Sequence, residues 1–322
     1  MEENQRIKVG VYGASGYAGQ DVVEILSKHP CAEVVFATSS TYAGQDVPFS
    51  DLKYIPHDTA PLDQVDAVFL ALPHGVSANV AKQALDAGAR VVDLSADFRL
   101  DTPESYQKWY SHPHPHPDLL PAPYGLPEIN RDNLHDVKLI ATPGCYPTTT
   151  ILGLYPLLKA GWLQPGHPIV VDAKSGVSGA GRDPDPTYAV EVYGNFSPYS
   201  VRRSHRRQKS SRRIEKVDPT VGALIFTASA TGGSRLDGGI YAPLADGHTS
   251  SEAQALYEAT YAGEPLVNVL PKGQLATLQH VVRKTIPAPS ASPRRPSSSS
   301  TSPASQQPAQ GRVRGRRCRI ST

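Results

Sequence analysis

The chain has 322 residues, a formal net charge of +2 and cysteine at only three positions. This length fits two ordinary domains with sizeable cores, and a charge near zero gives no general attraction to nucleic acid, so we do not expect a nucleic-acid partner. The cysteines form no CxxC pair, which argues against structural zinc and favours a reducing compartment. The charged start is unlike a signal peptide, and no apolar run approaches the roughly 20 residues that span a bilayer. We therefore expect a cytoplasmic protein with no membrane partner.

The first predicted elements surround a glycine-rich loop. Residues 7–12 form an apolar strand, and residues 21–28 have the pattern of a helix. Between them the chain is typical of a phosphate-binding turn, where glycines admit a pyrophosphate and free amides at the helix start point at it. The glycines recur at every third position instead of as GxGxxG, so a tight turn without a ligand is the alternative. The candidate cofactor residues here are Gly13, Ser15, Gly16, Tyr17 and Gly19.

The second predicted strand, residues 33–37, bears on which dinucleotide is bound. A site selective for NAD usually places an acid after this strand to bind the ribose 2′-hydroxyl. Here the strand is followed by hydroxyl side chains, including Ser39 and Ser40, and by no carboxylate. Hydroxyls accept a 2′-phosphate that an acid would repel, so NADP is the expected cofactor, although serines are also common in plain turns.

Further strands and helices alternate along the first half. Strands are predicted at 66–72, 89–94 and 138–141, and a helix at 76–85. This alternation indicates an α/β fold with a doubly wound parallel sheet, in which ligands bind beyond the carboxyl ends of the strands. The side chains of His74, Ser95 and Arg99 fall just past such ends, where ordinary loop residues also occur.

Three histidines, His112, His114 and His116, alternate with prolines. Closely spaced histidines suggest a metal site, but alternating prolines favour an extended segment whose side chains do not converge on one ion. We therefore expect no metal.

The most informative stretch is Thr142-Pro143-Gly144-Cys145-Tyr146-Pro147-Thr148. It lies between the strand at 138–141 and an apolar helix predicted at 151–160. Pro147 suits a first helical turn, and the threonines that follow are expected to satisfy free amides there. A thiol at this position feels the positive end of the helix dipole, which favours the nucleophilic thiolate. Cys145 is therefore a candidate catalytic nucleophile, and a buried small hydrophobe is the alternative.

The second half contains two further candidate segments. A strand at 168–173 leads into a glycine-rich loop, 174–182, whose hydroxyls, amides and two cations suit a phosphate or carboxylate and which includes Ser175 and Gly176. The basic segment 201–213 surrounds His205, and a cysteine enzyme needs an acid/base partner. A solvated charged face is the alternative interpretation of this segment.

The remaining predicted elements are strands at 224–227, 239–242 and 266–270 and a helix at 250–261. Residues 228–238 are polar and glycine-rich where a buried sheet needs an apolar strand. Residues 287–322 have no acid and almost no apolar side chain, so they cannot form a core and are expected to be a disordered basic tail.

Five stretches in this order resemble the N-acetyl-gamma-glutamyl-phosphate reductase family, the arginine-biosynthesis branch of the semialdehyde dehydrogenase superfamily. They are the loop 13–19, VDLSADFR ending at Arg99, YGLPE at 124–128, TPGCYPT around Cys145, and AKSGVSGAGR ending at Arg182. The resemblance is nearly continuous over residues 5–205 and returns at 264–282.

The resemblance implies a Rossmann-like NADP-binding domain over residues 1–144 and a catalytic α+β domain over 145–286, followed by the tail at 287–322. It implies NADPH-dependent reduction of N-acetylglutamyl phosphate, with Cys145 as nucleophile and His205 as acid/base. Gly13, Ser15, Gly16 and Gly19 match the phosphate loop, Ser39 and Ser40 fit the 2′-phosphate region, and the family is usually homo-oligomeric.

This sequence also departs from the family. Arg207 replaces the second histidine of the family's HRH motif, residues 228–238 replace a sheet strand, and the closing C-terminal run is absent. Because the resemblance stops abruptly and then recovers, we hypothesise that shifted reading frames produced these stretches. Resequencing the locus and finding this frame intact would refute that hypothesis.

Two alternative functions follow from the same residues. The altered segments favour a degenerate relative that at most binds a nucleotide, and binding without turnover would distinguish it. An aspartate-semialdehyde dehydrogenase shares the logic of the cysteine nucleophile, but the VDLSADFR and YGLPE stretches do not fit it.

Overall fold

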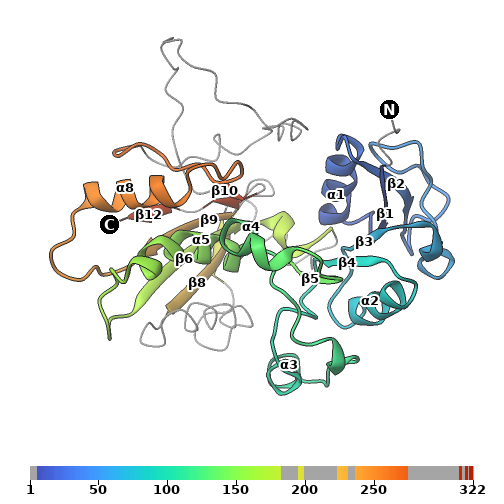
Figure 1. Ribbon diagram of the computed structural model, residues 1–322, viewed down its shortest axis with the longest axis horizontal. Helices are drawn as coiled ribbons and strands as arrows, with labels where there is room; N and C mark the ends of the chain where they lie inside the picture. The colour runs from blue at the N-terminus through green and yellow to red at the C-terminus, as the bar shows by residue number, and fades with distance from the viewer. Residues whose placement is uncertain are drawn as a thin grey trace, which may run out of the picture.

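The computed structural model of the chain describes residues 6–182, 195–198, 223–230, 236–274, 312–313, 316–317 and 319–321. Two five-stranded sheets organise these residues. The sheets lie towards opposite ends of the long axis, with α4 (Pro127–Asn130) between them (Figure 1).

The first sheet is entirely parallel, with strand order β2-β1-β3-β4-β5. Its strands are β1 (Ile7–Tyr12), β2 (Ala32–Ala37), β3 (Ala67–Leu70), β4 (Arg90–Asp93) and β5 (Leu139–Ala141). The chain proceeds from β1 to β2 on one side and then crosses to β3 on the other side of β1. In open α/β sheets ligands bind where the strand order reverses in this way, beyond the carboxyl ends of the strands.

Helices α1 (Tyr17–Ser27) and α2 (Ser77–Asp86) cover opposite faces of this sheet. Val9 and Val11 of β1 pack in one apolar cluster with Val22 of α1, whereas Val68 and Leu70 of β3 pack in another with the alanines of α2. Phe69, between those two β3 residues, faces the α1 cluster, as the alternation of side chains along a strand requires. The predicted doubly wound sheet is confirmed.

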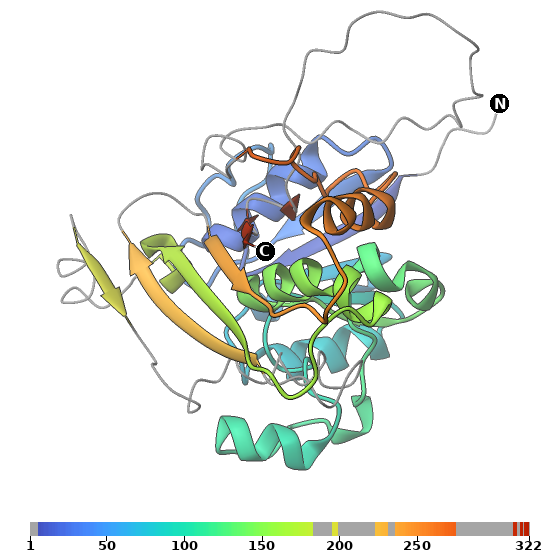
Figure 2. The same cartoon turned by 90° about the vertical axis from the view of Figure 1, so that its left-hand side faces the viewer.

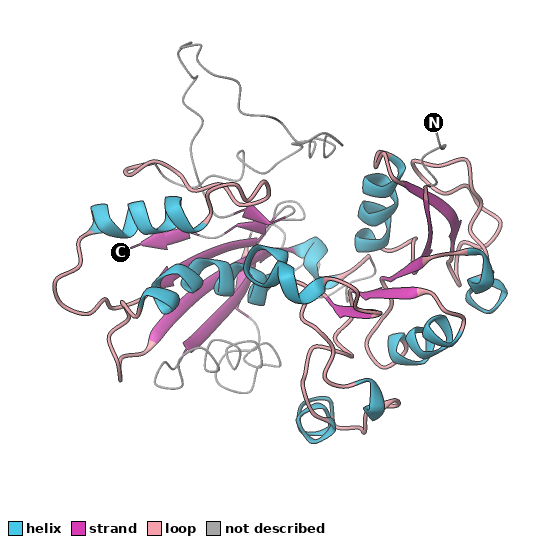
Figure 3. Cartoon of the chain, in the orientation of Figure 1, coloured by secondary structure: helices cyan, strands magenta, loops and turns pink. Residues whose placement is uncertain are grey.

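The second sheet is mixed, with strand order β12-β9-β6-β8-β7. Its strands are β6 (Ile169–Gly176), β7 (Phe196–Pro198), β8 (Ala223–Ala230), β9 (Leu236–Tyr241) and β12 (Arg319–Ser321). Helices α5 (Cys145–Ala160) and α8 (Ser250–Thr260) lie together against it (Figures 2 and 3). The hydroxyls of Tyr257 and Tyr261 donate to carbonyls of α5, which fastens the two helices to each other.

Helix α5 forms the centre of the second core. Twelve of its sixteen residues are buried, including Leu154 and Leu157, and they share one cluster with Val171 of β6 and Ile240 of β9. Such a helix has no exposed face, and its stability comes from packing instead of from its own propensity.

Two predictions about the second half need correction. Residues 266–270 are not a strand: Glu264 and Val267 form turns, while Val267 and Leu270 still bury their side chains. The strands predicted at 224–227 and 239–242 also extend into the polar stretch at 228–238, because β8 continues to Ala230 and β9 begins at Leu236. Both strands pair with β6 through backbone hydrogen bonds, and these bonds do not require an apolar side chain at each position.

The remaining described elements are short. They are helix α3 (Pro103–Tyr110), the 3-10 turns His57–Thr59, Leu62–Gln64, Pro117–Leu119, Arg131–Leu134 and Val177–Ala180, and strands β10 (Arg312–Val313) and β11 (Arg316–Arg317). Most of the expected disordered tail, 287–322, lies outside the described residues; within it only β10, β11 and β12 are described. In the described part of the chain, no helix is long and apolar enough to cross a membrane.

Candidate active site

The glycine loop lies between β1 and α1, at the carboxyl edge of the first sheet. Gly13 has a φ of +67°, which residues with a side chain rarely adopt. A Cβ at this position would lie 2.5 Å from the Ala71 carbonyl oxygen. A Cβ at Gly19 would lie 2.3 Å from the Gly13 carbonyl oxygen. These two glycines are therefore required by the fold itself, because they let the loop approach its own neighbours.

Gly16 has a different role. Its φ of −72° suits any residue, and a Cβ there would meet only the Gly13 carbonyl oxygen, at 3.5 Å, which is an ordinary contact. Gly16 is the N-cap of α1, and no side chain caps the helix amides. Free amides beside an open space form a cradle suited to a pyrophosphate, so the residues present fit a dinucleotide.

The serines of the loop and of the β2 end form one group. The Ser15 and Ser39 hydroxyls are 2.8 Å apart, and Ser39 Oγ also accepts from the Tyr42 amide at 3.1 Å. Ser39 is buried, whereas Ser40 is exposed. Of the two serines predicted to lie near the 2′-phosphate, Ser39 is therefore buried against Ser15, and Ser40 presents its side chain to solvent.

Cys145 is the first residue of α5, with Gly144 as N-cap. Its side chain is half-buried and the thiol is free. The prediction that threonines satisfy the helix amides was wrong: Thr148 Oγ1 donates to the Gly144 carbonyl at 2.8 Å, and no side chain caps the helix. The amides at this helix start therefore remain available to an anion at the sulfur.

Cys145 and the glycine loop lie at the same edge of the first sheet. The chain leaves β5 at Ala141, and the Thr142 amide and hydroxyl both bond to the Asp93 carbonyl at the end of β4, at 2.8 and 2.6 Å. Because all strands are parallel, the carboxyl ends of β1 and β5 share one edge. The fold therefore brings the nucleophile candidate to the edge where a dinucleotide binds.

Arg99 lies beside the N-cap of α5. Its Nε donates to the Thr142 carbonyl at 2.8 Å and its Nη2 to the Leu94 carbonyl at 2.6 Å. A Cβ on Gly144 would lie 2.9 Å from Nη1, so glycine at that position leaves room for the guanidinium. Sequence position alone could not separate Arg99 from an ordinary loop residue; the structure places its guanidinium beside Gly144, the residue before Cys145.

Two buried carboxylates hold the loops of this edge. Asp93 accepts from the hydroxyls of Ser77 and Ser95, at 2.6 and 2.7 Å. Burial raises the pKa of Asp93, and these hydrogen bonds oppose that shift. Asp97 accepts from the Gly75 amide at 2.7 Å and from the Ala78 amide at 3.0 Å, which fixes the start of α2.

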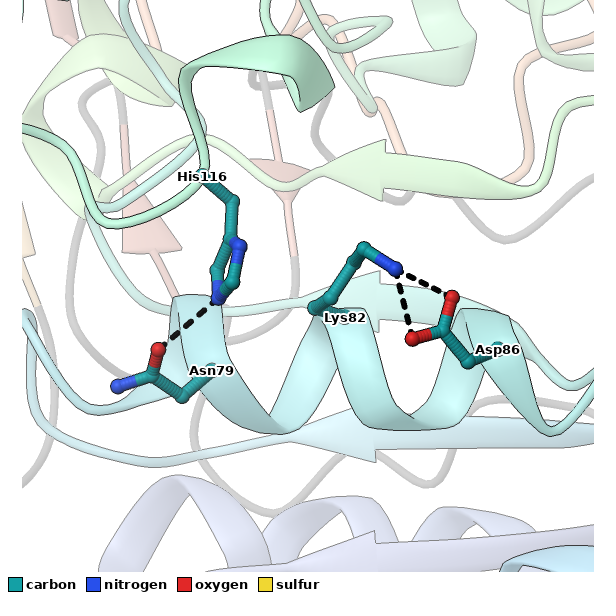
Figure 4. Close-up of polar contacts among 4 residues, drawn as sticks. All are labelled: Asn79, Lys82, Asp86 and His116. Carbon is teal, nitrogen blue, oxygen red and sulfur yellow. Dashed lines mark hydrogen bonds and ion pairs between the residues drawn. The ribbon is translucent and has the colours of Figure 1, made fainter.

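The histidine segment does not converge on one point. The rings of His112 and His114 pack against Tyr106, with centroids 5.3 and 4.7 Å apart. His116 instead extends to Asn79 of α2, 3.0 Å away, one turn before the Lys82–Asp86 pair (Figure 4). No group of three or more ligating side chains suited to a metal occurs among the described residues.

The loop after β6 runs from the second unit, which is the mixed sheet with α5 and α8, to the first unit, which is the parallel sheet with α1 and α2. Ser175 and Gly176, which were predicted to lie in the loop, are instead the last two residues of β6; Ser175 is buried and its hydroxyl donates to the Gly176 carbonyl at 3.1 Å. Arg182, at the end of this loop, places its guanidinium carbon 5.4 Å from the Tyr17 ring centroid and 5.7 Å from that of Tyr42. The sequence identified Arg182 only as one of two positively charged side chains in the predicted loop. Predicted His205 lies outside the described residues.

The first sheet is doubly wound and has a glycine loop suited to a dinucleotide, and a cysteine at the start of a helix lies at the same edge. These features define a dehydrogenase of the semialdehyde dehydrogenase class. Residues 8–137 match the family model "Semialdehyde dehydrogenase, NAD binding domain", and residues 145–288 match "Semialdehyde dehydrogenase, dimerisation domain". Solved structures give the same fold. The chain is similar to a probable aspartate-semialdehyde dehydrogenase from Pseudomonas aeruginosa, with a TM-score of 0.62 and 19% identity over 85% of this chain and 84% of that one.

Sequence similarity narrows the class. The chain is 42% identical over 279 residues to the N-acetyl-gamma-glutamyl-phosphate reductase of Pseudomonas paraeruginosa, covering 83% of this chain and 80% of the relative. It is 39% identical over 280 residues to that of Moorella thermoacetica, covering 83% and 81%. The chain belongs to the N-acetyl-gamma-glutamyl-phosphate reductase family, which confirms the resemblance found in the sequence.

Proposed function

We propose that this chain reduces N-acetyl-gamma-glutamyl phosphate to N-acetylglutamate 5-semialdehyde and phosphate, with NADPH as reductant, as a step of arginine biosynthesis. Membership of the family supports the reaction. The observation that carries it is Cys145 at the start of buried helix α5, beside Arg99.

Cys145 acts as the nucleophile in this proposal. No side chain caps the amides at the start of α5, the helix end that favours a negative charge, and the Arg99 guanidinium lies beside the N-cap residue Gly144. The thiolate attacks the γ-carbonyl carbon, and the bond between that carbon and the phosphate oxygen breaks. Phosphate departs, and the acyl group remains on Cys145 as a thioester. Covalent catalysis of this kind divides one difficult step into two easier ones.

Reduction follows at the same carbon. Bound NADPH supplies a hydride for the thioester carbonyl. The helix amides then hold the negative oxygen of the resulting thiohemiacetal, a contribution of about 3 kcal/mol in comparable oxyanion sites. The carbon–sulfur bond breaks and releases the semialdehyde. We assign the proton transfers at this oxygen to His205, as the resemblance implies.

The cofactor residues are proposed from the same edge of the sheet. Gly13, Gly16 and Gly19 shape the cradle, with Ser15 and Tyr17 at the start of α1. We assign Ser39 and Ser40 to the ribose 2′-position, and we include Ser175 and Gly176, the last two residues of β6. A solved relative of similar fold from Candida albicans, an aspartate-semialdehyde dehydrogenase, was crystallised with NADP, which supports this cofactor.

The proposed setting is cytoplasmic, and the proposed assembly is a homo-oligomer. The matched model for residues 145–288 is described as a dimerisation domain. We propose that residues 1–144 bind the cofactor and residues 145–286 bind the small-molecule substrate.

The test uses the reverse reaction, phosphate-dependent reduction of NADP⁺ by the semialdehyde. Cys145→Ser should abolish it, because a hydroxyl is a far weaker nucleophile than a thiolate. Cys31→Ser is the matched control: it removes the other free thiol among the described residues and should retain activity. Activity in Cys145→Ser would exclude the assignment, and NADPH binding without turnover in the unmodified chain would favour the non-catalytic alternative.

A further inference from the structure

The β2 end has no cation suited to a 2′-phosphate. Residues 38–55 contain a single basic side chain, Lys53, whose Nζ lies 2.6 Å from Asp46. Dinucleotide sites that accept a 2′-phosphate usually place an arginine near it. A chain that uses NADP must therefore supply this charge from another segment.

Arg182 comes from the second unit and lies over this region. It follows Gly181, whose φ of +110° turns the chain at the end of the loop after β6. Its guanidinium lies near the rings of Tyr17, in the first turn of α1, and Tyr42, after β2. The Tyr42 amide donates to Ser39 Oγ, so the guanidinium sits where the phosphate loop and the 2′-phosphate region meet.

The contacts of Arg182 leave its charge available. The guanidinium carbon lies within 6 Å of both tyrosine ring centroids, at 5.4 and 5.7 Å, and a contact between a cation and an aromatic ring uses none of the N–H donors of the guanidinium. The buried Nε has no hydrogen-bond partner within the described part of the chain, and no ion pair of Arg182 is found there. A planar fork of donors matches the oxygens of a phosphate, whereas an ammonium group acts only as a point charge.

We propose that Arg182 binds the 2′-phosphate of NADP, so that the preference for NADP over NAD is supplied by the second unit. This inference rests on the proposed function, which makes NADP the cofactor. Binding of the 2′-phosphate then joins the loop after β6 to the glycine loop of the first sheet. A cofactor without that phosphate does not make this connection.

The test is equilibrium binding to the full chain by titration calorimetry, with NADP⁺ and NAD⁺ and with adenosine 2′,5′-bisphosphate and 5′-AMP as probes. Arg182→Gln should weaken NADP⁺ and the bisphosphate about 10- to 100-fold, as expected for lost hydrogen bonds to a charged group. NAD⁺ and 5′-AMP should change less than about threefold. Arg182→Lys should recover part of the loss, because it keeps the charge without the fork.

Arg131→Gln is the matched control, because Arg131 is an exposed arginine paired with Glu264 and should bind all four ligands normally. Thermal unfolding without ligand establishes that each variant is folded. Equal weakening of NADP⁺ and NAD⁺ in both Arg182 variants would show that the residue only joins the two units, and it would overturn the proposal. Turnover does not enter these measurements, so selective binding without catalysis would contradict the proposed function and leave the role of Arg182 supported.

Discussion

Gly16→Ala should weaken the cofactor without weakening the fold. The added Cβ meets only the Gly13 carbonyl oxygen at 3.5 Å, and the backbone at φ −72° and ψ 162° accepts alanine. Losing glycine at an N-cap costs a few tenths to about 1 kcal/mol, and a stiffer unfolded chain offsets about 0.4–1 kcal/mol. The free energy of unfolding should therefore change by less than about 1 kcal/mol. The methyl group instead occupies the cradle, and NADPH affinity should fall at least about tenfold, or about 1.4 kcal/mol.

Gly19→Ala, three residues further along the chain, should instead weaken the fold. Its Cβ would lie 2.3 Å from the Gly13 carbonyl oxygen and 2.7 Å from Ala14 Cα, and backbone atoms cannot move aside cheaply. Forcing a methyl group into such a contact costs about 1–3 kcal/mol. For a domain of about 150 residues or more, each kcal/mol lowers the Tm by about 2–4 °C.

Two measurements on both variants decide the matter: thermal unfolding without ligand, and titration with NADPH followed by the fluorescence of the bound nicotinamide. If Gly16→Ala binds NADPH as tightly as the unmodified chain, the loop does not approach the cofactor as argued. If Gly19→Ala unfolds at the unmodified Tm, the close contact is not a constraint of the fold.

Two further predictions concern the two cores. Tyr257→Phe removes the buried hydrogen bond to the Gly153 carbonyl and should cost about 0.5–1.5 kcal/mol, the net contribution of one hydrogen bond, lowering the Tm; an unchanged Tm would argue against the link between α8 and α5. Burial lowers the pKa of His114 below its usual 6.5. The imidazole of His114 then stays neutral in the native state while it takes up a proton in the unfolded chain. Its contribution to the free energy of unfolding is therefore fully present above about pH 6.5 and decreases below that pH by up to about 1.4 kcal/mol per pH unit. His114→Gln should reduce the loss of Tm between about pH 7.5 and about pH 5.5, whereas the exposed control His167→Gln should not, and equal pH profiles would contradict this origin.

Local patterns were sufficient for most of the first unit. Short apolar runs predicted β1 to β5 and the helices α1 and α2, because a parallel sheet with both faces covered leaves few alternatives, whereas α3 and α4 were not predicted. The same logic placed Cys145 at the start of a helix, since glycine and proline determine where a helix begins. Residues 266–270 show the limit of this reasoning: an apolar run of strand length pairs with no described strand, and it buries Val267 and Leu270 from irregular backbone.

The sequence by itself therefore determined the fold class, the glycine loop, the lack of an acid after β2 and the nucleophile candidate, because each depends on residues close together in the chain. The tertiary structure decided which glycines serve the fold and which face a ligand, since that depends on contacts with Ala71 and Gly13 oxygens that no spacing reveals. It also decided that Arg99 lies beside Gly144 and that Arg182 crosses to Tyr17 and Tyr42. These pairs are far apart in sequence: the pairing of β4 with β5 brings Arg99 to Gly144, and the packing of the two units brings Arg182 to the two tyrosine rings.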